Sequence, residues 1–104
     1  MNDMNGVIRY IEAAQYILDH YGQKKQELQA VQELSELILL LAARPDQRKE
    51  GYVQNITEEI ADVHVMLMQV SLMYGITNDQ IDDVIKEKLL RQLDRIDKEK
   101  EAQT

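Results

Sequence analysis

Apolar residues recur along most of the chain at the three- and four-residue spacing of an amphipathic α-helix. The pattern breaks at Gly22, Pro45 and Gly75, residue types that end helices, and so predicts four helical segments. No stretch alternates as a β-strand would. The stripes expected to face the core are Val7, Ile11, Ala14, Leu18 and Tyr21; Leu28, Val31, Leu34, Leu37, Ile38 and Leu41; Ile56, Ile60, Val63, Leu67, Val70 and Tyr74; and Ile81, Ile85, Leu89 and Ile96.

Two of the predicted helices have a capping box at their start. Asn55 with Glu58 would begin the third helix, and Thr77 with Gln80 would begin the fourth. The only long connection is "RPDQRKEGYVQ", residues 44–54, and the polar tail from about residue 98 is expected to fray. We therefore predict one all-α domain over residues 1–104, an antiparallel four-helix bundle with a disordered tail at 98–104.

The charge balance narrows the classes of partner. The chain has 12 Lys and Arg against 19 Asp and Glu, a formal net charge of −7, which opposes binding to nucleic acid. It has no cysteine, which excludes disulfides and thiolate chemistry. The N-terminus does not resemble a signal peptide, and the apolar run "LILLLAA" is too short to span a membrane. These features predict a cytoplasmic protein.

Acidic residues occur in pairs, spaced i, i+3, on two of the helices. The second helix carries Glu33 and Glu36, and the third carries Glu59 and Asp62. Glu33 and Glu36 lie on a second face of their helix, away from the main apolar stripe, beside Leu40.

The strip that begins with Glu59 and Asp62 continues into Met66, Gln69 and Met73. A solvated acidic face would not continue into methionines, so this pair is a candidate for chemistry. The alternative is that Glu58 and Glu59 lie in a first helical turn and complement the helix macrodipole.

Two antiparallel helices would bring these four carboxylates together, where they would repel one another unless a cation joined them. A ligand set of oxygen atoms alone selects hard cations, which predicts Mg²⁺, with Mn²⁺ as the alternative. A di-iron centre is disfavoured because no histidine stands three residues after a glutamate. His20 and His64 are expected to be structural or surface residues.

The combination of "ELSE", Glu33 to Glu36, with "EIAD", Glu59 to Asp62, across a variable spacer resembles the MazG-like all-α nucleoside triphosphate pyrophosphohydrolases. The resemblance extends from about residue 22 to residue 96 and is closest to short, single-domain, phage-type members. It implies that the four acids hold Mg²⁺ and that a nucleoside triphosphate is cleaved to the monophosphate and pyrophosphate. Glu58 is a further candidate for the general base.

The fourth helix adds basic residues to the resemblance. "KLLRQLDR" is similar to the family's Lys-x-x-Lys/Arg-Asn-x-x-Arg pattern, which implies that Lys88, Arg91 and Arg95 contact substrate phosphates. Gln92 stands where the family has Asn, Gln32 precedes Glu33 where the family often has Glu, and His64 takes a position that is commonly apolar or acidic. Gln26, two turns before Glu33, is a candidate for a nucleobase contact.

The third helix is apolar on nearly every side, and a single four-helix bundle cannot bury all of this apolar surface. This predicts a homodimer or homotetramer built on the second and third helices. The competing function is a non-enzymatic helical module, derived from the same family, that binds a nucleotide or a protein without turnover.

Overall fold

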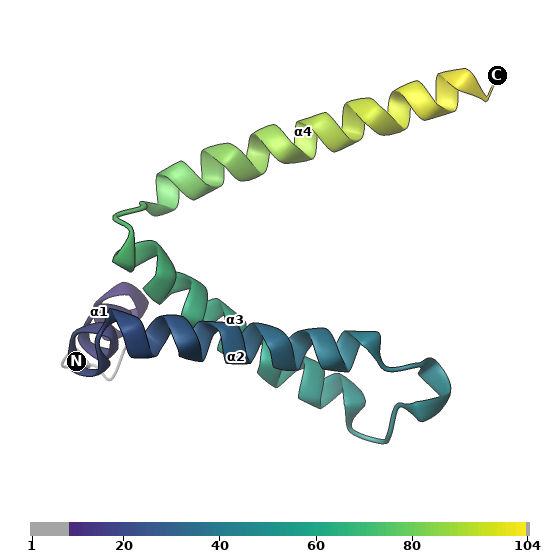
Figure 1. The fold of residues 1–104 in the computed structure, drawn as a ribbon. Coiled ribbons are helices and arrows are strands. Elements are labelled where there is room, and N and C mark those ends of the chain that lie inside the picture. The colour runs from purple at the N-terminus through teal and green to yellow at the C-terminus, as the bar shows by residue number, and fades with distance from the viewer. Residues whose placement is uncertain (1–8, 104) are drawn as a thin grey trace. The chain divides into compact units, whose positions relative to one another are not determined.

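The computed structural model describes residues 9–103, and this part of the chain is helical without any strand (Figure 1). The elements are α1 (Tyr10–Tyr21), α2 (Gln23–Ala42), the short 3₁₀-helix η1 (Pro45–Gln47), α3 (Tyr52–Met73) and α4 (Asn78–Ala102). The predicted all-α class with four α-helices is confirmed, and the assembly of all four into one bundle stays a prediction. Val7, assigned to the first stripe, lies outside the described residues.

The chain divides into two compact units, one ending at Tyr74 and one beginning at Gly75. In the first unit α2 and α3 lie side by side and antiparallel, and α1 packs against both (Figure 1). At one end of the pair the Tyr74 hydroxyl donates to the Glu27 carboxylate. At the other end the Tyr52 hydroxyl donates to the Leu40 carbonyl. The buried apolar residues of the described chain are few: Ala14, Leu18, Ala30, Val63 and Met66.

The face of α2 that packs inside this unit is not the one that the apolar stripe predicts. Val31, Ile38 and Leu41 are exposed, each to 58% or more, whereas Gln26 and Ala30 are buried. The expectation that these residues form the core contact of α2 was therefore wrong, whereas Leu37, from the same stripe, is half-buried. Helix α2 has an apolar face and a second face that carries the small or polar residues Gln26, Ala30 and Glu33. The second face is the one that packs against α3.

Helix α3 begins four residues earlier than the capping-box prediction, with its N-cap at Gly51 instead of Asn55. Gly51, in the left-handed conformation with φ of 83°, precedes Tyr52, and the Asn55 amide donates to the Gly51 carbonyl inside the helix. Asn55 is therefore not the N-cap, and that prediction was wrong. The first turn of α3 contains no acidic residue. Glu58 and Glu59 consequently lie beyond the reach of the macrodipole, which removes the alternative explanation for their position.

In the second unit α4 starts with the predicted capping box. The Gln80 amide donates to Thr77 Oγ1 at 3.1 Å, and the Thr77 amide donates to Gln80 Oε1 at 2.8 Å. The helix then continues to Ala102, so the predicted fraying from Lys98 was wrong. Lys98 pairs with Asp94 one turn earlier at 3.0 Å, and no glycine or proline interrupts this part of the chain.

No helix in the described residues is long and apolar enough by itself to cross a bilayer, and α3 and α4 reach that length and apolarity only when they are counted together across the break between them.

Candidate metal centre

The contact between α2 and α3 follows a seam whose residues recur at spacings of three and four. Most seam positions are small or apolar, but two levels are polar. One level joins an amide on each helix, and the other joins carboxylates. The seam residues are Gln26, Ala30, Glu33, Leu37 and Leu40 on α2, and Ile56, Glu59, Val63, Met66 and Gln69 on α3.

The carboxylate level brings three of the four predicted acids together. One carboxylate oxygen from each of Glu33, Glu59 and Asp62 lies within 4.8 Å of the others. The oxygens around a single Mg²⁺ are at most about 4 Å apart, since each Mg²⁺–oxygen bond is about 2.0–2.1 Å long. Small side-chain rotations are therefore enough to let these three groups bind one cation.

Two of these carboxylates are incompletely satisfied by the protein. Glu33 Oε1 accepts a hydrogen bond from Gln29 Nε2 at 2.9 Å. The second oxygen of this carboxylate, Oε2, does not take part in that bond. Within the described chain neither Glu33 Oε2 nor Glu59 Oε2 has a hydrogen-bond partner, and both atoms are buried. Buried carboxylate oxygens are costly without a partner, so the arrangement is suited to a cation or a proton.

The electrostatics of the cluster act most strongly on Glu59. Burial, followed by the negative charges of Glu36, Glu33 and Asp62, raises the pKa of Glu59 to about 7. Without a cation, the cluster therefore reduces its own repulsion by holding a proton near neutral pH.

This raised pKa predicts a specific pH dependence of folding. Between the unfolded pKa of 4.5 and about 7, the folded protein binds a proton at Glu59 that the unfolded chain has released. The stabilisation is complete below pH 4.5 and is lost as the pH rises through about 7. In EDTA, the free energy of unfolding measured with urea should therefore fall over this window in the wild type relative to Glu59→Gln.

The same measurement can include a divalent cation. Mg²⁺ binds the deprotonated carboxylates, so it should raise the midpoint of unfolding more at pH 8 than at pH 5. An identical pH dependence in the wild type and in Glu59→Gln would contradict the assignment of the proton to this site.

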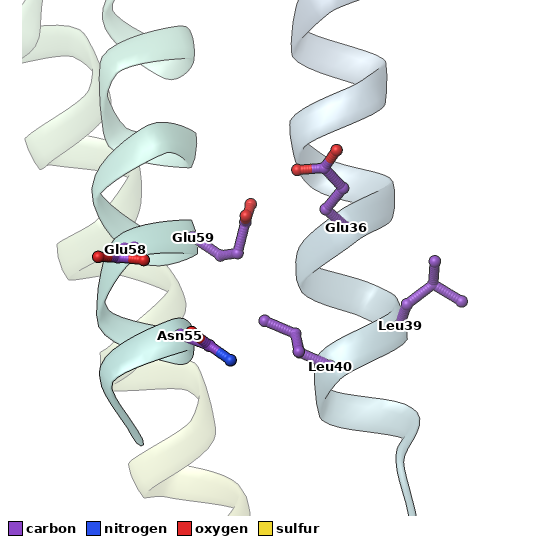
Figure 2. A pocket seen from close by; sticks show the side chains of 6 residues that line it. All are labelled: Glu36, Leu39, Leu40, Asn55, Glu58 and Glu59. Atoms are coloured by element: carbon purple, nitrogen blue, oxygen red, sulfur yellow. The ribbon is translucent and has the colours of Figure 1, made fainter. Parts of the chain in front are cut away.

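The fourth acid, Glu36, faces the same space from α2. Figure 2 shows Glu36 and Glu59 extending toward one another from facing helices. They line a pocket of about 400 Å³ together with Glu58, Asn55, Leu39 and Leu40. The pocket thus joins the acidic cluster to an apolar wall, and its volume lies within the usual range for small-molecule sites.

The structure changes the role of one predicted substrate residue. Gln26 is buried at the α2–α3 contact, where its Nε2 donates to Gln69 Oε1 at 2.8 Å. Its amide is therefore engaged inside the protein, and the predicted nucleobase contact is wrong. Gln29 and Gln69 were not recognised as site residues. The signal for Gln29 was its position one turn before Glu33, where an amide can reach the carboxylate.

The predicted phosphate-binding residues lie in the second unit. Lys88, Arg91, Gln92 and Arg95 are all exposed on α4, and Arg91 pairs with Glu87 at 3.6 Å. Both histidines are exposed, and neither belongs to the carboxylate trio.

Comparison of the chain with protein-family models, with curated proteins and with solved structures gives no match. The assignment of function consequently depends on the chemistry of the site.

Proposed function

We propose that this protein is a Mg²⁺-dependent nucleoside triphosphate pyrophosphohydrolase, which converts an NTP or dNTP to the monophosphate and pyrophosphate. The observation that carries the proposal is the meeting of Glu33, Glu59 and Asp62 from two helices, with their ligand oxygens within 4.8 Å. The resemblance of "ELSE" and "EIAD" to the MazG-like motifs supports the choice of reaction.

The donor set fits the proposed metal. It consists of carboxylate oxygens, the ligands that Mg²⁺ and Mn²⁺ prefer, and two of these oxygens are buried without a partner in the described chain. Glu36 would complete the set from the pocket side. When bound, the cation supplies positive charge for an anionic triphosphate and polarises its phosphoryl oxygens.

The residues of the chain would divide the remaining tasks. The pocket beside the cluster would receive part of the nucleotide, with Leu39 and Leu40 as its apolar wall. Water attacks the α-phosphorus, the bond to the pyrophosphate oxygen breaks, and a carboxylate accepts the proton of the water. Glu58 lines the pocket without belonging to the trio, which makes it a candidate for this general base.

Lys88, Arg91 and Arg95 are proposed to offset the charge of the leaving pyrophosphate, and Gln92 to contact the substrate in the place of the family's Asn. The support for this part is the resemblance of "KLLRQLDR" together with the exposure of all four side chains on α4.

We also propose that the working unit is a homodimer or homotetramer. The support is the outer face of α2, where Val31, Leu34, Ile38 and Leu41 are exposed at alternating three- and four-residue spacing. This is the pattern by which one helix packs along another. A chain with so small a buried apolar core gains stability when such a face is covered.

The test is to incubate the purified protein with Mg²⁺ and each of a panel of NTPs and dNTPs and to separate the products by chromatography. We expect monophosphate and pyrophosphate in equal amounts from at least one nucleotide, and no product after chelation. If a folded, Mg²⁺-binding sample turns over no nucleotide, the pyrophosphohydrolase proposal fails, and the non-enzymatic binding module takes its place.

A further inference from the structure

The second polar level of the α2–α3 seam has no role in the proposed chemistry, yet both of its side chains are buried, and Gln69 is the most buried of the described residues. The exposed fraction of Gln69 is 1%, and that of Gln26 is 6%. Their amides form the one hydrogen bond between buried side chains of α2 and α3 that the described residues contain, from Gln26 Nε2 to Gln69 Oε1 at 2.8 Å.

A buried amide pair contributes little net stability, because each amide gives up hydrogen bonds to water. Its effect is directional, since any other alignment of the helices would bury both amides without partners. In helix pairs, a single polar level among apolar ones fixes the register at some cost in stability. Apolar residues around the amide pair, such as Ala30 and Met66, resist a shift of α2 along α3 less than the amides do, because dispersion contacts have no fixed direction.

The amide pair stands at a defined distance from the acids. Gln26 precedes Glu33 by seven residues on α2, and Gln69 follows Asp62 by seven residues on the antiparallel α3. Seven residues are two helical turns, so on antiparallel helices Glu33 and Asp62 lie at one level, two turns from the level of the amide pair. An alignment that pairs the two amides therefore also pairs the carboxylates.

We infer that Gln26 and Gln69 are a positioning pair, which sets the register of α2 on α3 and so brings Glu33, Glu59 and Asp62 within reach of one cation. This inference rests on the proposed metal site for its functional consequence, but the register itself is independent of it. The like charges of the acids oppose their approach, so an alignment that brings them together requires a directional contact elsewhere in the seam.

The test replaces the amides with apolar side chains of similar size, in the double variants Gln26→Met/Gln69→Met and Gln26→Leu/Gln69→Leu. Replacing both partners leaves no unsatisfied amide, so the metal-free melting temperature should be equal to or above that of the wild type. The affinity for Mn²⁺, followed by electron paramagnetic resonance of the free ion, should fall by about tenfold, the loss expected when ligands are no longer held in place. Gln32→Leu, at an exposed amide of α2, is the matched control.

Register is measured separately, through spin labels. The chain has no cysteine, so Ser35→Cys on α2 and Thr57→Cys on α3, both exposed, give one label on each helix. The metal-free distance distribution should be narrow in the otherwise wild-type chain and broader or shifted in the double variants. If the wild type binds no Mn²⁺, the proposed function fails while the distances still test the register.

An unchanged distance distribution in both double variants would overturn the inference. Loss of folding in both would overturn it as well, because the amides would then be holding the helices together rather than selecting their register.

Discussion

Asp62→Asn is expected to lower kcat/KM for nucleotide hydrolysis by at least about a hundredfold. Removing a residue that only supports a metal ligand typically costs about 10- to 100-fold, so loss of a charged ligand itself should cost no less. The substitution keeps the size of the side chain and removes its charge. Release of pyrophosphate at saturating Mg²⁺ is the measurement, compared with Asp19→Asn, which makes the same change at an exposed residue of α1.

A second readout separates loss of the ligand from loss of the fold. The charge of Asp62 is one of the causes that raise the pKa of Glu59, so removing this charge relieves repulsion in the metal-free protein. The melting temperature of Asp62→Asn in EDTA should therefore match or exceed that of the wild type. Activity that stays within a few-fold of the wild type would show that Asp62 does not bind the catalytic cation.

Ile38→Glu is expected to reduce the mass of the protein in solution to that of one chain. Ile38 is 63% exposed on α2, at the centre of the face formed with Val31, Leu34 and Leu41. A carboxylate introduced there would have to be buried without a partner, and next to its own copy if the contact is twofold, which opposes association. Sedimentation equilibrium at micromolar concentration measures the effect directly.

The matched control is Gln32→Glu, which adds the same charge to α2 away from that face and should leave the mass unchanged. A wild-type mass equal to one chain would rule out the proposed assembly. If the Ile38→Glu variant keeps the wild-type mass, the contact between copies uses another surface.

The local features of the fold could be predicted from the sequence because they depend on residues close together in the chain. The structure has helix breaks at Gly22 and Gly75 and the capping box of Thr77. Each of these features depends only on residues within about one helical turn. The acidic strip of α3 was recognised for a similar reason. Its continuation into Met66 and Gln69 indicated a packed face, and both residues are buried.

The wrong predictions concern features that depend on contacts with another element, namely the start of α3 and the buried face of α2. Asn55 and Glu58 form a valid capping box in sequence, but Gly51 can take a left-handed conformation and Tyr52 can reach the Leu40 carbonyl, so the helix begins earlier. On α2 the periodicity predicts that the more apolar face forms the core contact, yet that face is exposed.

The helices, the excess of acidic residues and the two acidic pairs can be predicted without a structure, since each follows from composition or from spacing within one helix. The face of α2 that meets α3 depends on tertiary packing. Hydrophobic periodicity ranks the faces of a helix by apolarity, whereas packing selects the face that complements a partner distant in the sequence. Because of that packing, Gln26, which the sequence predicts to contact a nucleobase, is a buried partner of Gln69, and Glu33 lies beside Glu59 and Asp62.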